Sequence, residues 1–308
     1  MTVVVTVAAL LVLVVLLPFL AEAFRVPITK SIQDKAPGQI ARLPQGATHY
    51  RWSGPEDGPV AICIHGLSTP SYIFAATENS LVGLGYRVLT YDLFGRGYSH
   101  RAKGPQTADF FLSQLRALLE NQNVKGEVVV LGFSMGGQIA TAFASEEGTR
   151  IKALIIVASA GLQRLKASGH SRFWLMPWIG GWLTRVAGGW ALRRELVESR
   201  TTATVIPDLE DRQAAETRTR GFLPALLSSR RHLLANAATE DHAQIARNGT
   251  PVLAIWGAED PVISLSAIGA LAEVNPNAQH VQISGAGHSL LQTHPAQVAE
   301  ALRKFLTP

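Results

Sequence analysis

The stretch at residues 127–147, EVVVLGFSMGGQIATAFASEE, constrains the fold more than any other part of the chain. Its short apolar run, Val128–Leu131, is typical of a strand that is buried on both faces. The turn Gly-Phe-Ser-Met-Gly follows, and small and apolar residues then recur at helical spacing. A strand, a sharp turn and a helix form the setting in which G-x-S-x-G is a nucleophile elbow with Ser134 at its tip. The two glycines remove side chains that would clash there, and the helix points its positive end toward Ser134.

The length and composition indicate a globular chain with a large apolar core. The chain has 308 residues, of which 47% are hydrophobic and 17% are charged, enough for one large α/β domain or two small ones. Cys63 is the single cysteine and lies in the apolar run Val60–Ile64. We therefore expect it to pack in the core, and one cysteine excludes an internal disulfide framework and a multi-cysteine metal site. We find no phosphate-binding loop or metal-ligand cluster in the sequence, so we expect neither a cofactor nor a metal.

The first 21 residues carry no charged side chain. At about 1.5 Å per residue, a helix of this length could cross the hydrocarbon core of a bilayer, which is about 30 Å thick. An Ala-Glu-Ala triplet at residues 21–23 also resembles a signal-peptide cleavage site, but no Lys or Arg precedes the apolar run. We expect residues 1–24 to be a membrane anchor, or a signal segment of an exported protein if the chain is cleaved near Ala23. Arg25 and Lys30 favour a cytoplasmic location for the residues that follow.

Apolar strands and amphipathic helices alternate along most of the remaining chain. This order predicts a mostly parallel sheet flanked by helices. Thr107 predicts the start of a helix over residues 108–121, and Pro295 predicts the start of the last helix. The expected strands cover residues 48–52, 60–64, 87–91, 128–131, 151–158, 252–256 and 280–283, the first of them at an edge of the sheet.

Residues 162–249 interrupt this alternation. They are mostly helix-forming and lie between two expected core strands, so they predict a helical cap inserted between core residues 25–161 and 250–308. The cap contains 13 Lys/Arg against 8 Asp/Glu, which equals the chain's net charge of +5. It has no dense basic tract with interleaved aromatic residues, so we expect no nucleic-acid binding, whereas attraction to anionic lipid fits better. Its aromatic residues either pack the cap on the core or form an apolar wall for a lipophilic substrate.

A serine hydroxyl becomes a strong nucleophile only when a base takes its proton and a third group orients that base. Of the nine histidines, His288 is our candidate for the base, because it lies in a glycine-rich loop directly after the last expected strand. This position places it at the carboxyl edge of the sheet, where Ser134 also lies. His65 lies at the same edge, but its neighbour Gly66 indicates that it shapes a loop.

The acid should also follow a strand at this edge. Asp260 directly follows the expected strand over residues 252–256, and Glu259 is the neighbouring alternative. Asp92 follows a strand too, but it precedes the serine in the chain, so we expect it to bridge loops. The order Ser134, Asp260, His288 matches the serine–acid–histidine order of one fold family.

An oxyanion hole requires two backbone N–H groups. We expect one from Met135, the residue after the serine, and the other from Leu67 in the loop after the strand at residues 60–64. The alternative for that loop is an ordinary tight turn at His65-Gly66.

Together these motifs make the chain resemble the α/β-hydrolase fold superfamily, and within it the capped serine esterases and monoacylglycerol-lipase-like enzymes. The resemblance covers residues 45–308 and implies an eight-stranded, mostly parallel sheet and a Ser–His–Asp acyl-transfer mechanism without a cofactor. A serine at the elbow, rather than an aspartate, distinguishes the chain from haloalkane dehalogenases and epoxide hydrolases. The long apolar run at the N-terminus departs from the soluble members. The motifs in family order are His65-Gly66-Leu67, DLFGRGYS at residues 92–99, the elbow at Ser134, Asp260, and Gly287-His288.

The sequence therefore predicts a membrane-associated serine hydrolase. Its expected substrate is a lipophilic small-molecule carboxylic ester. The alternatives within the fold are a carbon–carbon hydrolase and a proline-type aminopeptidase. A peptidase would need an acidic pocket for the substrate amine, and the positive charge of the predicted cap argues against one. A ligand-binding protein that has lost turnover is the alternative outside enzymes. The sequence gives no signal for the oligomeric state.

Overall fold

The computed structural model describes residues 1–163, 171–198 and 203–307. Its strands are β1 Gln39–Leu43, β2 Gly46–Ser53, β3 Val60–Ile64, β4 Arg87–Tyr91, β5 Val128–Phe133, β6 Ile151–Val157, β7 Val252–Gly257 and β8 Gln279–Ile283. They form one eight-stranded sheet in the order β1-β2-β4-β3-β5-β6-β7-β8. The β1–β2 and β2–β4 pairs are antiparallel and all other pairs are parallel. The predicted mostly parallel sheet is thus confirmed, with its antiparallel strands at one edge.

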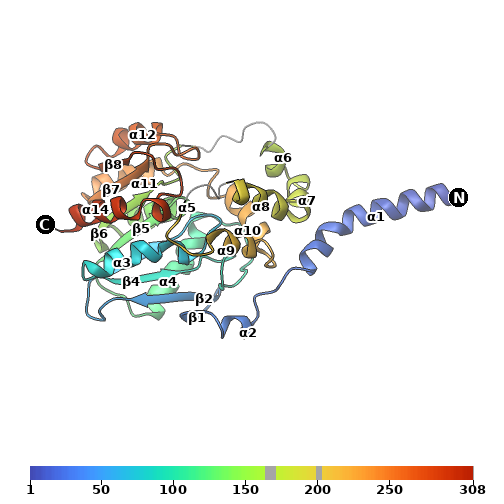
Figure 1. Cartoon of the computed structure of the whole chain (residues 1–308), viewed down its shortest axis with the longest axis horizontal. Coiled ribbons are helices and arrows are strands. Elements are labelled where there is room, and N and C mark those ends of the chain that lie inside the picture. Colours follow the sequence, from blue (N-terminus) through green and yellow to red (C-terminus); the bar gives the residue numbers. More distant parts are fainter. Residues whose placement is uncertain (164–170, 199–202, 308) are drawn as a thin grey trace.

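Helices cover both faces of the sheet (Figure 1). They are α1 Thr2–Ala23, α2 Lys30–Gln33, α3 Ala75–Gly83, α4 Ala108–Asn121, α5 Met135–Glu147, α6 Ser171–Leu175, α7 Ile179–Val186, α8 Gly188–Glu198, α9 Leu209–Glu216, α10 Phe222–Arg231, α11 Thr239–Arg247, α12 Ser266–Val274, α13 Leu290–Thr293 and α14 Pro295–Leu306. Helices α3 and α14 pack together on one face, and α4, α5, α11 and α12 form the layer on the other.

Strand β3 shows why the central strands read as unbroken apolar runs. Ile62 and Ile64 belong to the apolar cluster on the α4–α5 side, whereas Ala61 and Cys63 belong to the cluster on the α3–α14 side. All four side chains are fully buried, because a parallel sheet covered on both faces has no polar side. Burial raises the pKa of the Cys63 thiol, which agrees with the predicted packing role.

Two predicted helix boundaries are confirmed. Helix α4 begins after Thr107, whose hydroxyl oxygen accepts a hydrogen bond from the N–H of Phe110 at 3.3 Å. This bond satisfies one of the N–H groups that a helix start leaves unpaired. Helix α14 begins at Pro295 and buries Val298 and Leu302 against the sheet.

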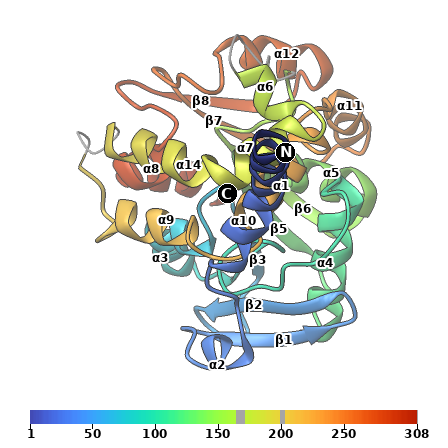
Figure 2. The same cartoon turned by 90° about the vertical axis from the view of Figure 1, so that its right-hand side faces the viewer.

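The chain between β6 and β7, which we call the inserted segment, contains α6 to α11. Helix α11 packs against α5 and α12 and so belongs to the helix layer of the core. Helices α6 to α10 lie beyond one end of the sheet, between the core and α1 (Figures 1 and 2). Of the predicted cap, residues 164–170 and 199–202 lie outside the described residues.

Helix α1 projects away from the sheet and packs against α7 (Figure 1). By length and composition this helix could cross a membrane, and signal sequences share that property. Nearly all of its side chains are exposed, and Pro18 is its buried residue.

Candidate active site

Ser134 occupies the sharp turn between β5 and α5. Its backbone angles, φ 54° and ψ −119°, lie in a region that side-chain-bearing residues rarely adopt. A Cβ on Gly132 would lie 2.3 Å from the carbonyl oxygen of Gly136, and a Cβ on Gly136 would lie 2.0 Å from that of Ile64. The two glycines are therefore required by close backbone contacts, as the sequence motif predicts.

Three side chains predicted to act together lie within hydrogen-bond distance of one another. The Nε2 atom of His288 lies 3.0 Å from the hydroxyl oxygen of Ser134. Its Nδ1 atom lies 2.8 Å from Oδ2 of Asp260. The other carboxylate oxygen of Asp260 accepts the N–H groups of Val262 and Ile263 at 2.7 and 2.9 Å. Because the carboxylate accepts a hydrogen bond from Nδ1–H, the tautomer that fits this geometry has its lone pair on Nε2, where it can accept the serine proton.

Burial differs between the two partners. The side chain of Asp260 is 2% exposed, whereas that of His288 is 23% exposed. The acid is thus shielded from water while the imidazole remains open to a reactant.

The parallel sheet explains why residues so distant in sequence meet. Ser134, Asp260 and His288 follow β5, β7 and β8, whose carboxyl ends share one edge. The loops after β7 and β8 are further joined by the N–H of Glu259, which donates to the carbonyl of Ala286 at 2.9 Å. The side chain of Glu259 is exposed, so the carboxylate that contacts His288 is that of Asp260.

The loop after β3 passes directly against the serine. A Cβ on Gly66 would meet the Cβ of Ser134 at 3.3 Å. Within the described parts of the chain, the N–H groups of Leu67 and Met135 have no hydrogen-bond acceptor. The oxyanion role of these two N–H groups remains a prediction.

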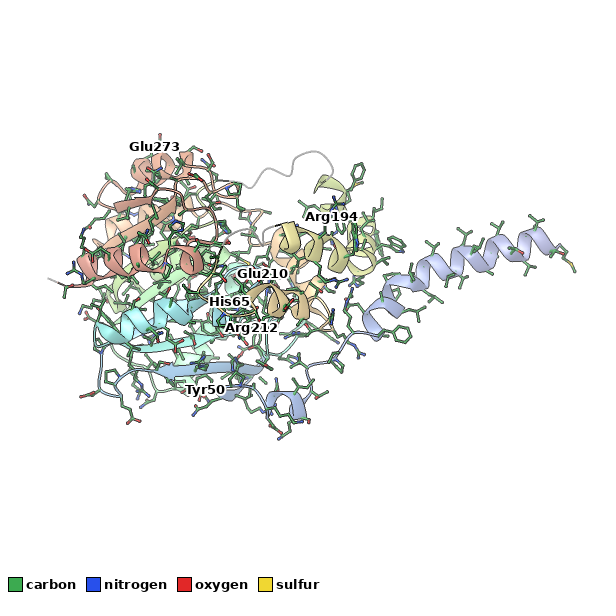
Figure 3. The ribbon with its side chains drawn as sticks, viewed as in Figure 1. Tyr50, His65, Arg194, Glu210, Arg212 and Glu273 are labelled. Atoms are coloured by element: carbon green, nitrogen blue, oxygen red, sulfur yellow. The ribbon has the colours of Figure 1, made fainter. Side chains whose placement is uncertain are left out.

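His65 helps to shape this loop. Its Nδ1 lies 2.8 Å from the carbonyl oxygen of Gly66, and its Nε2 accepts the N–H of Leu93 at 2.9 Å. Burial lowers the pKa of His65 to about 4, so the ring is neutral and cannot donate from both nitrogens. His65 is fully buried; in Figure 3 its label lies toward the middle of the molecule, whereas Arg194 lies on the side of α1. The geometry agrees with the predicted structural role.

Asp92 bridges loops as predicted, but its principal partner was not predicted. Oδ1 accepts the N–H and hydroxyl of Ser71 at 2.9 and 2.6 Å, and Oδ2 accepts the N–H of Tyr98 at 3.0 Å. His49 in β2 completes the set, with Nδ1 2.8 Å from Oδ2 and Nε2 against the carbonyl oxygen of Pro37. Burial alone would raise the pKa of Asp92, but its hydrogen bonds and the nearby histidines lower it below its usual range.

Arg96 is a second residue that sequence analysis did not single out. It is fully buried, and its Nε–H donates to the carbonyl of Leu67 at 3.0 Å. Its Nη1 donates to Gln106 at 2.5 Å and its Nη2 to the hydroxyl of Ser229 in α10 at 2.7 Å. Burial lowers the pKa of Arg96 to about 9. The guanidinium thus joins the loop beside Ser134 to the inserted segment.

An apolar pocket of about 300 Å³ lies within the inserted segment, between α6, α7, α8 and α10. Leu223 and Leu226 of α10 line it. The same two leucines and Phe222 form an apolar cluster, and the side chain of Leu67 packs against that cluster. The pocket is therefore connected by direct packing to the loop that passes Ser134.

The described residues contain no group of three or more His, Cys, Asp or Glu side chains that could hold a metal ion.

Comparisons with known proteins identify the fold family of the chain. A family model described as the alpha/beta hydrolase fold matches residues 59–295. The chain is 25% identical to the hydrolase LipZ of Mycobacterium tuberculosis, over 82% of this chain and 90% of that protein. It is 26% identical to the pimeloyl-[acyl-carrier protein] methyl ester esterase of Xanthomonas oryzae pv. oryzae, over 81% of this chain and 95% of that protein. The crystal structure of an enol-lactonase from Burkholderia xenovorans LB400 covers 88% of this chain and all of its own, with TM-score 0.72 and 20% identity; this last likeness concerns the fold.

Proposed function

Since the chain belongs to the α/β-hydrolase fold family, we propose that it is a serine hydrolase that cleaves carboxylic esters. One observation carries the proposal: the His288 ring joins Ser134 Oγ, at 3.0 Å, to Asp260 Oδ2, at 2.8 Å. This is the arrangement of nucleophile, base and orienting acid that acyl transfer requires. Similarity to a methyl ester esterase supports an ester as the substrate.

In the proposed reaction, Ser134 Oγ attacks the ester carbonyl carbon while His288 Nε2 takes the hydroxyl proton. The N–H groups of Leu67 and Met135 bind the negative oxygen of the tetrahedral intermediate, and each donor is worth about 10²–10³ in turnover. His288 then gives its proton to the leaving alcohol, and Asp260 stabilises the imidazolium between these steps. Water, activated by the same histidine, releases the acid from the acyl-enzyme.

We also propose that the inserted segment is a cap over this site and that the substrate is lipophilic. The apolar pocket of about 300 Å³ supports both points, because Leu223 and Leu226 lie in its wall and belong to the apolar cluster against which Leu67 packs. An acyl chain that extended from the oxyanion loop could bury its methylene groups there, each worth about 0.8 kcal/mol.

The test uses the full chain in detergent beside its Ser134→Ala variant. Both proteins are assayed on p-nitrophenyl esters of short to long acyl chains and on a dipeptide anilide, and both are treated with a fluorophosphonate. We expect ester turnover that rises with acyl length and is abolished in Ser134→Ala, with the probe attached to the peptide that contains residue 134. Ser284→Ala, which changes an exposed serine in the loop before His288, is the matched control and should retain turnover.

Other outcomes point elsewhere. Turnover of the anilide alone would replace the esterase with a peptidase. Folded protein that hydrolyses no ester and takes up no probe would contradict the proposal and favour a ligand-binding protein.

A further inference from the structure

Helix α1 contains a proline, and a side chain of the cap compensates for it. Pro18 has no N–H, so the carbonyl of Val14, four residues earlier, lacks its partner within the helix. The indole N–H of Trp182 in α7 donates to that carbonyl at 2.7 Å. Pro18 is buried, and α7 packs against α1. The helix is therefore joined to the cap at the turn where its own hydrogen-bond ladder is interrupted.

A second attachment lies where α1 ends. The N–H of Val26 donates to the carbonyl of Arg218 at 3.0 Å, and the N–H of Arg220 donates back to Val26 at 2.8 Å. The carboxylate of Glu22 accepts the N–H of Gly221 at 2.9 Å. Two attachments along its length fix the direction of α1 relative to the cap.

Beside α1, the cap exposes large apolar side chains at the corner between α6 and α7. Trp178 is 91% exposed, and three further exposed side chains surround it in sequence: Phe173, Met176 and Ile179. We call these four residues the apolar corner. Contiguous exposed apolar side chains mark interaction sites, and tryptophan is enriched where a membrane meets water.

Basic residues lie at the other attachment, near the end of α1. A groove of about 400 Å³ there is lined by Arg25, Arg193 and Arg218 together with Phe24 and Trp190. We call the three arginines the arginine collar. Guanidinium groups bind phosphate oxygens with paired hydrogen bonds, and basic juxtamembrane residues attract anionic lipid.

The length of α1 sets the positions of the two attachments along the helix axis. Its 22 residues extend about 33 Å, enough to cross a hydrocarbon core of about 30 Å. The Trp182 contact at Val14 lies about 14 Å from the end of the helix at Ala23. The residues before Val14 extend only about 18 Å, which is too short to cross the core alone. α1 therefore crosses a bilayer only if the part of the cap that is bonded to Val14 enters it as well.

We propose that α1 and the apolar corner form one surface that is embedded in a bilayer. The apolar corner lies among the acyl chains of the nearer leaflet, and the arginine collar lies at the phosphates of anionic lipids. Lipid surroundings strengthen the Trp182–Val14 bond, because an unpaired carbonyl is strongly disfavoured where water is absent. This inference does not depend on the reaction that the site performs.

The first test measures immersion with a single spin label. Met176→Cys probes the apolar corner and Leu265→Cys, before α12, is the matched control, since these side chains are 41% and 39% exposed. Helix α12 lies far from α1 (Figure 1), and Cys63 is buried, so each variant takes one label. The full chain is placed in phosphatidylcholine vesicles with and without phosphatidylglycerol, and relaxation by oxygen and by a water-soluble nickel chelate is compared.

We expect the label at residue 176 to be reached several-fold better by oxygen than by nickel, and the label at residue 265 to show the reverse. Phosphatidylglycerol should lower nickel access at residue 176 further. Equal nickel access at both positions would overturn the embedded surface. An intact mass that lacks the first 23 residues would overturn it too, because the mature chain would then have no α1.

The second test concerns the hydrogen bond. Trp182→Phe should raise nickel access at residue 176 several-fold in the unchanged chain, which contains Pro18. The same substitution should have little effect in a Pro18→Ala chain, because an alanine at this position supplies the missing N–H to the carbonyl of Val14. Equal effects in both chains would show that the Trp182 ring acts by packing alone, and this would overturn the proposed compensation.

Discussion

Two histidine–aspartate pairs in this molecule have the same separation and different surroundings. The pair His288–Asp260 and the pair His49–Asp92 are each 2.8 Å apart. The outer nitrogen of His288 faces the Ser134 hydroxyl, which can donate a proton, whereas that of His49 faces the Pro37 carbonyl, which can only accept one.

The difference bears on the protonation of the His49 ring. His49 must carry a proton on both nitrogens to satisfy its two acceptors, so it is an imidazolium that is almost fully buried beside a carboxylate. Burial lowers the pKa of His49, but the hydrogen bond and charge of Asp92 raise it by more, and the net pKa lies above its usual value. A histidine–aspartate pair therefore indicates a base only when its outer nitrogen faces a proton donor.

The largest expected effect separates the pairs by activity. Asp260→Asn removes the carboxylate that holds Nδ1–H of His288, so the ring loses its orientation and its stabilised positive charge. We expect kcat for an ester to fall by about 10⁴, with a melting temperature within a few degrees of the unchanged chain. Comparable turnover in the variant, measured on the same p-nitrophenyl ester, would show that Asp260 is not the orienting acid.

The matched change in the other pair should act on stability. Asp92→Asn leaves the buried His49 imidazolium without its counter-charge, which costs about 3–5 kcal/mol. Urea unfolding followed by circular dichroism measures the loss, and kcat per folded molecule should fall far less than in Asp260→Asn. An Asp92→Asn variant that is fully stable but inactive would contradict this prediction, because the effect would then lie on activity and not on stability.

The inserted segment places a further acid near the buried pair His49–Asp92. Glu216 in α9 accepts the N–H of Gly97 at 3.0 Å, and burial raises the pKa of Glu216 to about 7. In the unfolded chain this group titrates near pH 4.3, so the folded state binds its proton more tightly, and stability falls as pH rises from about 4.5 to 7. Glu216→Gln should remove up to about 3 kcal/mol of this decline in unfolding free energy. If the unfolding free energies of the variant and the unchanged chain run parallel with pH, Glu216 is not the source of the decline.

The smallest expected effect is the contribution of His49 to the unfolding free energy, which changes at higher pH than that of Glu216. Because the pKa of His49 is raised on folding, its contribution to stability is complete below about pH 6.5 and is lost as pH rises through the folded pKa. The difference in unfolding free energy between the unchanged chain and His49→Gln should therefore shrink above neutrality. A difference that grows with pH would mean that the ring is neutral in the folded state.

Local patterns in the sequence were sufficient for most of the core. Apolar runs located the central strands, and G-x-S-x-G located Ser134, because strand burial and tight turns leave their signal in adjacent residues. The positions of Asp260 and His288 followed from one topological rule, that parallel strands end at a common edge. Their catalytic roles remain predictions that the first experiments address.

The remaining features depend on partners that no local pattern reveals. Arg96 meets Ser229 across 133 positions of the chain, and Trp182 meets Val14 across 168. His49 lies on a strand whose alternation was recognised, but its charge depends on Asp92 and on the Pro37 carbonyl, which come from other segments. Helix α12 was not predicted, because its short run of small and apolar residues does not distinguish a helix from a strand.

The missing backbone hydrogen bond at Pro18 also affects the order in which contacts form during synthesis. Val14 leaves the ribosome 168 residues before Trp182, which at about 5–20 residues per second is a delay of roughly ten to thirty seconds. During that interval the Val14 carbonyl has neither its helical donor nor the indole. The Val14 carbonyl therefore gains its hydrogen-bond donor only after more than half of the polypeptide has been translated. The final packing of the N-terminal helix is thus a late step of biogenesis rather than an early one.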